Sequence, residues 1–184
     1  MTKTGTSAQL IGAMLLTLAV TGCSSTVNGA PEPAGASTPA ATPTGPANPF
    51  ATLNQCSLVN EILAGQGFPP AQPTIADAKR TCRATIPTSS ADTDGIGVAI
   101  SLQNGQKYTE NINHPDTARN GDIDGRPIIE QPEPLRVKGG CQVGMAVGDN
   151  ARALVMVVSG SDTKRACAKA EEVATALSAR LPKN

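Results

Sequence analysis

Net charge and long basic runs are absent from this chain. Its 184 residues include 15 Lys or Arg and 15 Asp or Glu, so the formal net charge at pH 7 is zero. Nucleic-acid binding depends on clustered Lys and Arg side chains that neutralise phosphates. The sequence has no such cluster. The charge pattern therefore excludes nucleic acid as a partner.

Aromatic residues are nearly missing as well. The chain has two Phe, one Tyr and no Trp. Its core must therefore be built from Val, Ile, Leu, Ala and Met, which bury less apolar area per residue than aromatic side chains do. A small aliphatic core gains from covalent support, and disulfides are the support to expect.

A hydrophobic run long enough to span a membrane is also lacking. The apolar segment from Leu10 to Val20 follows Lys3, the only charge in this N-terminal stretch. It has about 11 residues, whereas a membrane-spanning helix needs roughly 20. A charged start and a short apolar run are typical of a secretory signal peptide. We expect residues 1–22 to be such a signal and to be removed on export.

A cysteine follows this run directly. The residues Val20-Thr21-Gly22-Cys23 resemble the bacterial lipoprotein box, in which an aliphatic residue and two small residues precede an acylated cysteine. The resemblance implies that Cys23 becomes the N-terminus and holds the chain on the outer face of the cell membrane. Acyl chains contribute about 0.8 kcal/mol per buried methylene, so two or three chains attach a protein durably. The alternative is a chance cysteine after an ordinary signal peptide.

The segment 23–49, after the acylated cysteine itself, has the composition of a disordered tether. It is rich in Ser, Thr, Ala, Gly and Pro and contains almost no large apolar side chains. Nothing then offsets the roughly 1–2 kcal/mol per residue that ordering a backbone costs. Fully extended, the tether reaches roughly 80 Å. Thr38-Pro39 and Thr42-Pro43-Thr44 resemble acceptors of O-linked sugars, with unmodified threonines as the alternative.

Four cysteines remain in the single domain that we predict at residues 50–184. An exported domain lies in an oxidising compartment, where four cysteines favour two disulfides. Three connectivities are possible, and we favour Cys56–Cys82 with Cys141–Cys167 because each bond then ties a predicted helix to a nearby strand. The alternative is a metal site. The sequence has neither a Cys-x-x-Cys pair nor a His cluster, so we expect no metal.

Two helices are predicted at the ends of this domain. The first begins at Thr52 or Asn54 and ends at Ala64, with an apolar stripe formed by Leu58, Val59, Ile62 and Leu63. The second begins after Ser161-Asp162 and carries apolar residues at three- and four-residue steps until Pro182 stops it.

The apolar period changes from 3.6 to 2 between these helices. Residues 96–102 alternate in this way up to the turn dipeptide Asn104-Gly105, and residues 141–147 and 153–158 are predicted to form a hairpin. Weaker strand candidates are 82–86 and 126–130. The predicted fold is α+β, with an antiparallel sheet of about four to six strands, the N-terminal and C-terminal helices packed on one face, and two disulfides.

Motifs spread over nearly the whole chain carry a family resemblance. Beyond the lipobox and the tether, these are PFATLNQCSLVNEILAGQGF, RTCRA, DIDGRPII, GGCQVGMAVGDN and ACAKAEEVATALSARLP. With them the chain resembles a family of actinobacterial, mycobacterial-type surface lipoproteins whose domain has no assigned function. Relatives tend to have a Trp two residues beyond the second cysteine, where this chain has Ala84. The resemblance implies a surface lipoprotein and transfers no activity.

Candidate catalytic or metal-binding residues are few. His114, the only histidine, lies in a polar stretch without a nucleophile motif, so we expect a solvated loop residue, with a general base as the alternative. Asp92-Thr93-Asp94-Gly95 and Asp122-Ile123-Asp124-Gly125 open like calcium loops. The fifth position, where an EF-hand needs a third oxygen ligand, holds Ile96 in one and Arg126 in the other, and strands follow, so we expect turns. We expect no catalytic residue and no cofactor, and the sequence identifies no ligand-binding residue.

The sequence as a whole favours a non-enzymatic function. We expect a membrane-anchored extracytoplasmic lipoprotein, attached through Cys23, whose domain binds an envelope protein or a small apolar ligand. The alternative is a cell-wall-acting hydrolase or transferase accessory that uses Asp122 and Asp124, because paired carboxylates suit glycoside chemistry when they flank a cleft. Two facing carboxylates in a deep pocket would favour the enzyme, and a shallow apolar groove would favour binding.

Overall fold

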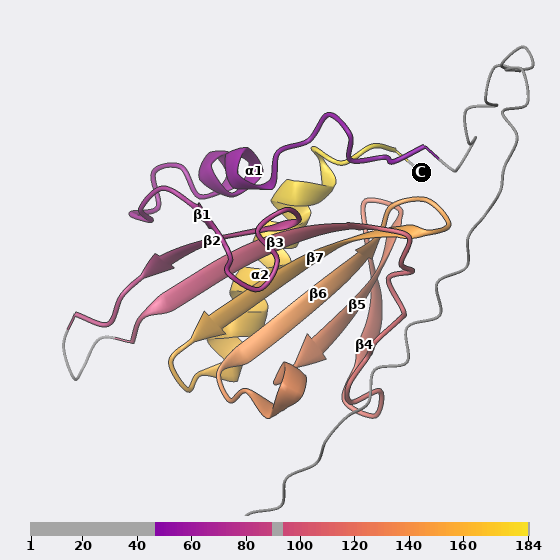
Figure 1. The fold of residues 1–184 in the computed structure, drawn as a ribbon. Coiled ribbons are helices and arrows are strands. Elements are labelled where there is room, and N and C mark those ends of the chain that lie inside the picture. The colour runs from indigo at the N-terminus through magenta and orange to yellow at the C-terminus, as the bar shows by residue number, and fades with distance from the viewer. Residues whose placement is uncertain (1–46, 90–93, 184) are drawn as a thin grey trace, which may run out of the picture. The chain divides into compact units, whose positions relative to one another are not determined.

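The computed structural model describes residues 47–89 and 94–183 (Figure 1). Within them, two α-helices and a short 3-10 helix, η1 (Pro134–Arg136), accompany a seven-stranded antiparallel sheet of order β1-β2-β3-β7-β6-β5-β4. The helices are α1 (Gln55–Ile62) and α2 (Thr163–Ser178). The strands are β1 (Gln72–Pro73), β2 (Thr81–Ile86), β3 (Ile96–Asn104), β4 (Arg119–Ile123), β5 (Arg126–Pro132), β6 (Gly140–Ala146) and β7 (Ala151–Ser159). The predicted α+β fold is confirmed.

The sheet has more strands than the four to six expected. The five segments with alternating side chains became β2, β3, β5, β6 and β7, and β6 and β7 form the predicted hairpin. The two strands that were not predicted lie at the edges. β1 has only two residues, one of them proline, and β4 is Arg-Asn-Gly-Asp-Ile with every residue at least partly exposed. Edge strands of this kind carry too few buried side chains to show a period of two.

The helices begin where side-chain caps are available. The Oδ1 atom of Asn54 accepts a hydrogen bond from the backbone N–H of Ser57 at 2.9 Å, and Asp162 caps α2 in the same way. α1 ends at Ile62, two residues before the predicted end at Ala64. α2 ends at Ser178, although the buried Leu181 continues its apolar side.

Both helices lie on one face of the sheet, called here the helix face. The strand register aligns Cys82, Ile100, Val155, Val143 and Glu130 across β2, β3, β7, β6 and β5. Residues aligned in this way point to the same side of a sheet. The core between this face and the two helices is formed almost entirely by aliphatic side chains, as the composition predicted.

Two disulfides fix the helices to that face. Cys56 in α1 is bonded to Cys82 in β2, and Cys167 in α2 is bonded to Cys141 in β6. This is the pairing favoured from the sequence. The two bonds indicate that the domain folds in an oxidising compartment outside the cytoplasm. Among the described residues no helix has the length and hydropathy to cross a bilayer.

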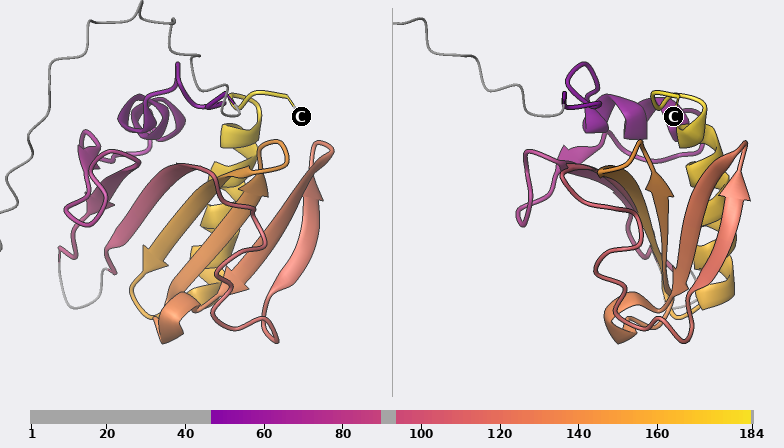
Figure 2. Two further views of the ribbon diagram at one scale, coloured as in Figure 1. Left: turned by 45° about the vertical axis from the view of Figure 1, so that its right-hand side comes forward. Right: turned by 90° about the vertical axis from the view of Figure 1, so that its right-hand side faces the viewer.

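The other side of the sheet, called here the open face, carries no helix. The chain leaves β3 near one edge of the sheet and returns as β4 at the other edge. The connecting segment 105–118, called here the strap, runs on the side of the sheet away from α2 (Figure 2). The strap divides the open face into a covered part over β5, β6 and β7 and an uncovered part over β2, β3 and the end of β7.

Candidate functional site

A buried arginine holds the strap on the sheet. Arg152 lies on the open face of β7 and is only 5% exposed. Its guanidinium donates to Gln103 Oε1 at 2.7 Å, to Gln106 Oε1 at 2.8 Å and to the carbonyl oxygens of Lys107 and Glu110. Burial lowers the pKa of Arg152, and the nearby Glu110 carboxylate opposes this shift. The positive charge is thus surrounded by one oxygen atom of β3, that of Gln103, and by oxygen atoms of the strap.

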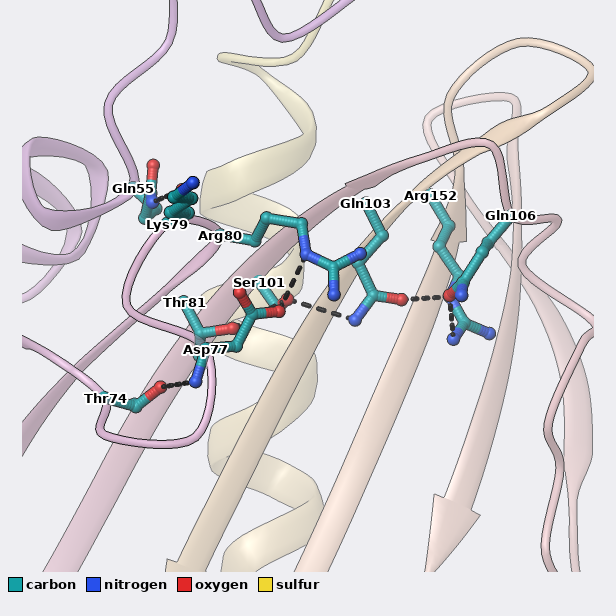
Figure 3. Close-up of polar contacts among 10 residues, drawn as sticks. All are labelled: Gln55, Thr74, Asp77, Lys79, Arg80, Thr81, Ser101, Gln103, Gln106 and Arg152. Carbon is teal, nitrogen blue, oxygen red and sulfur yellow. Dashed lines mark hydrogen bonds and ion pairs between the residues drawn. The ribbon is translucent and has the colours of Figure 1, made fainter. Parts of the chain in front are cut away.

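The polar row continues from Arg152 toward the other edge of the sheet (Figure 3). The Nε2 atom of Gln103 donates to Ser101 Oγ at 3.1 Å, and Thr81 Oγ1 donates to the same oxygen at 2.9 Å. Beyond β2, Arg80 forms an ion pair with Asp77 at 2.8 Å. These contacts occupy the end of the open face near Asn104 with side chains that already have partners.

A second buried residue fixes the middle of the strap. Gln131 in β5 is 0% exposed, and its side-chain oxygen accepts from the backbone N–H groups of Asn113 and His114 at 3.1 and 3.0 Å when the amide is oriented toward them. Gly144 lies below this segment, and a Cβ there would be 3.3 Å from the carbonyl oxygen of Tyr108. The strap therefore approaches the backbone of β6 closely.

The uncovered part of the open face forms an apolar groove of about 360 Å³. Gly97 and Ala99 of β3 form its floor together with Met156 and Val158 of β7, and the Val158 side chain is 38% exposed. Because the β3 residues are small, the sheet is hollowed between β2 and β7. The full lining is Arg83, Thr85, Ile86, Pro87, Thr88, Gly95, Ile96, Gly97, Ala99, Met156, Val158 and Gly160.

Charge is distributed unevenly along this groove. Arg83 is its only charged lining residue, and within the described part of the chain its side chain has no ion pair or hydrogen bond. Asp94 lies at the other end, where its carboxylate fills the space that a side chain at Gly160 would need. The groove thus has a cation at one end, an acid beyond the opposite end and apolar side chains between.

A wider hollow adjoins the groove at the sheet edge. It measures about 780 Å³ and is lined by the chain around Pro69–Ala76 and by Arg83, Ala84 and Thr85. Ile75 in this segment is fully exposed. Arg83 and Thr85 belong to both hollows, so the groove and the edge form one continuous surface around β2.

The residues that the sequence singled out lie elsewhere. His114 is in the strap, where its carbonyl oxygen accepts from both the N–H and the hydroxyl of Thr117. Asp122 and Asp124 flank the β4–β5 turn, and Asp122 Oδ1 accepts from the N–H of Gly125 at 2.7 Å. Within the described part of the chain, no hydrogen bond or ion pair joins His114 to either aspartate. Neither of these aspartates lines the groove.

The prediction of a turn at Asp122–Gly125 is confirmed. Asp124 and Gly125 have φ values of 52° and 79°, as a two-residue hairpin turn requires. In the other Asp-rich segment, Asp92 and Thr93 lie outside the described residues, as does Cys23.

One group of possible metal ligands occurs among residues 47–89 and 94–183. A carboxylate oxygen of Glu130 and the sulfur atoms of Cys141 and Cys167 all lie within 4.8 Å of one another. The two sulfur atoms are bonded to each other, so they are not available as thiolate ligands. We therefore interpret the group as structural.

Sequence reasoning missed the residues that shape the open face. Arg152 stands inside the otherwise apolar run ARALVMVV, and Gln131 lies in the strand segment RPIIEQP after the apolar pair Ile128-Ile129. A charged or amide side chain at such a position is a signal for a buried polar contact. The small residues Gly97 and Ala99 occupy the non-apolar positions of the alternating strand 96–102. Their small size does not indicate a groove unless the residues that neighbour them in space are known.

Comparison with known proteins gives one match. The model of the DUF3558 family, described as a protein of unknown function, matches residues 18–180. Neither the curated proteins nor the solved structures include a significant match. No activity, ligand or partner is transferred by similarity.

Proposed function

From the premise that the chain belongs to the DUF3558 family of proteins of unknown function, we propose that it is a lipid-anchored binding protein of the cell envelope. Cys23 carries the lipid on the outer face of the cell membrane, and the segment 24–49 tethers the domain to it. The domain binds an envelope component through its open face and performs no catalysis.

The observation that carries the binding function is the apolar groove. Soluble domains rarely expose large contiguous apolar patches, and a hollow lined by apolar side chains with few polar groups is the usual form of a binding site. The volume of about 360 Å³ lies within the range of small-molecule sites. The floor of the groove rests on strands of the sheet, and four lining residues at its end, Pro87, Thr88, Gly95 and Gly160, lie outside the strands.

The anchor is supported by the sequence and by the disulfides. The Val20–Cys23 lipobox lies directly after an apolar run, and the two disulfides indicate a domain outside the cytoplasm. We expect Cys23→Ala to move the protein from the membrane fraction to the medium, whereas Ser24→Ala remains in the membrane fraction. A Cys23→Ala protein that still partitions into detergent contradicts the anchor.

Binding is tested by photo-crosslinking in intact envelopes. A photoreactive amino acid at Val158 faces the groove, and one at Lys164 on the exposed side of α2 serves as the matched control. We expect a crosslinked envelope component from position 158 and none from position 164. Absence of any product at position 158, with the protein folded and in the membrane, contradicts a binding role for the groove.

The alternative of a cell-wall-acting enzyme that uses Asp122 and Asp124 gains no support from the geometry. The two aspartates belong to one tight turn, and Asp122 already accepts a backbone hydrogen bond. Glycoside chemistry needs two carboxyl groups about 5 Å or more apart on either side of a substrate. Asp122→Asn is expected to leave any envelope phenotype unchanged. Loss of function in this variant would support the enzymatic alternative.

A further inference from the structure

The groove also indicates the chemistry of its ligand. We propose that it binds an amphiphile with one anionic head and a short apolar body. The head lies between Arg83 and Thr85, and the body lies over Gly97, Ala99 and Met156 toward Gly160. The inference deepens the proposed function and rests on it.

The position of Arg83 supports an anionic head. Three of the five other exposed arginines in the described residues have acidic partners: Arg80 pairs with Asp77, Arg119 with Glu130 and Arg180 with Glu61. Arg136 and Arg165 are exposed too, but neither lines the groove. Arg83 has no such partner within residues 47–89 and 94–183, although it is the only charge that lines an apolar groove. A guanidinium next to apolar surface binds a carboxylate, phosphate or sulfonate through charge-assisted hydrogen bonds.

Thr85 supplies a second, independent observation. It follows Arg83 by two residues on the same face of β2, and both residues line the groove. Its hydroxyl is buried and has no hydrogen-bond partner in the described part of the chain. An unpaired buried hydroxyl is unfavourable, and most such groups in proteins have a partner. An oxygen of the anionic head would supply that partner.

The remainder of the groove determines the body of the ligand. From Ala99 to Ile96 the floor extends about 10 Å at roughly 3.3 Å per residue, with no charged side chain along it. At its far end the carboxylate of Asp94 lies against Gly160. A second negative charge at that end would be repelled, so the ligand carries one anionic group rather than two.

The test measures binding of a defined probe by the exported chain with Cys23→Ala, which has no acyl groups of its own. The probe is anilinonaphthalene sulfonate, a fluorescent anionic amphiphile. Its displacement is measured with three competitors, decanoate, decanol and decyltrimethylammonium. We expect decanoate to displace the dye at a concentration about ten-fold lower than the cationic amphiphile does. Equal potency of the two charged competitors overturns the assignment of an anionic head.

Three variants locate the site. Arg83→Gln should weaken decanoate binding about five- to ten-fold and remove the preference over the cation, because it removes a hydrogen bond to a charged group. Gly97→Leu should abolish displaceable binding, since a Cβ at Gly97 meets its nearest neighbour only at 3.4 Å and the side chain then fills the groove. Arg165→Gln, on the exposed side of α2, is the control. Unchanged binding in Arg83→Gln or Gly97→Leu overturns the proposal.

Thr85→Val separates ligand binding from folding. Replacing an unpaired buried hydroxyl with a methyl group should raise the melting temperature slightly and weaken decanoate binding by a few-fold. If Thr85→Val changes the melting temperature but not decanoate binding, Thr85 does not contact the anionic head, and this part of the proposal is wrong.

Two outcomes separate the ligand class from the proposed function. If decanoate and dye do not bind while the photoreactive residue at position 158 still captures an envelope component, the ligand class is wrong and the proposed function stands. If neither the amphiphiles bind nor position 158 gives a crosslinked product, the groove is not a binding site.

Discussion

Glu130 on β5 lies against the Cys141–Cys167 disulfide, with a carboxylate oxygen and both sulfur atoms within 4.8 Å of one another. The residue is 5% exposed. Its burial raises the pKa of the carboxyl group above the ordinary value of 4.5, and a hydrogen bond with Glu171 and the negative charge of Glu171 raise it further. Arg119, whose Nη1 atom is 3.6 Å from the Glu130 carboxylate, opposes the shift. Relative to the unfolded chain, the folded domain therefore shifts the titration of Glu130 toward higher pH.

This relationship predicts a pH dependence of stability. A carboxyl group with a raised pKa in the folded state contributes most below its unfolded pKa, and this contribution is lost as the pH rises through the folded value. The free energy of unfolding should therefore fall from about pH 4.5 upward relative to that of Glu130→Gln. Urea titrations of both proteins between pH 4 and pH 8 measure the difference. Glu172→Gln, on the exposed side of α2, should follow the wild-type curve, and parallel curves for Glu130→Gln and wild type would contradict the prediction.

Replacing Arg152 should release the strap. Arg152→Met removes the donors to Gln103, Gln106 and the carbonyl groups of Lys107 and Glu110. Hydrogen bonds to a charged group contribute roughly 1.5–3 kcal/mol, and some of the freed carbonyl groups regain water, so we expect a loss of about 2–3 kcal/mol. Hydrogen exchange of strap amides should accelerate at least ten-fold. The control Arg165→Met leaves both quantities unchanged, and a protected strap in Arg152→Met would show that other contacts hold it.

Two glycines with the same backbone conformation should respond differently to alanine. Gly139 and Gly65 have φ values of 74° and 75°. A Cβ at Gly139 would overlap the carbonyl oxygen of Gly160, whereas a Cβ at Gly65 meets nothing within 4 Å. Gly65→Ala should therefore cost only the backbone strain, about 1–2 kcal/mol, and Gly139→Ala should cost at least twice as much because β6 and β7 must separate there. Equal thermal shifts in the two variants would contradict the close approach.

The two disulfides should contribute similarly through the unfolded chain. Each joins cysteines 26 residues apart, and a closed loop of this size stabilises by about 3.5 kcal/mol in the chain-entropy model. The double variants Cys56→Ala/Cys82→Ala and Cys141→Ala/Cys167→Ala should each lose roughly this amount in urea unfolding. Mass spectrometry after alkylation should find no free thiol in the mature wild-type domain and four after reduction. Two or more free thiols in the purified protein would refute the framework.

Local sequence patterns predicted the elements that bury one side. The apolar stripe ending at Leu63 and the alternation from Ile96 to Leu102 show in the sequence itself which side chains face the core. Patterns of this kind were enough to predict α1, α2 and the central strands. The side-chain caps Asn54 and Asp162 are equally local. The cysteine pairing followed from the same elements, because each bond joins a helix to a strand that its sequence had already indicated.

The amino-acid sequence by itself determined the α+β class, the two helices, the central strands and an aliphatic core that two disulfides support. Only the tertiary structure decided which part of the open face the strap covers and where the groove lies, because that surface depends on contacts between residues far apart in the chain. Arg152 acquires its role from carbonyl groups more than forty residues away, and the groove exists because Gly97 and Ala99 lie between Arg83 and Met156. A small side chain on an exposed strand gives no signal in the sequence, and the hollow that it leaves can be recognised only when its neighbours in space are known.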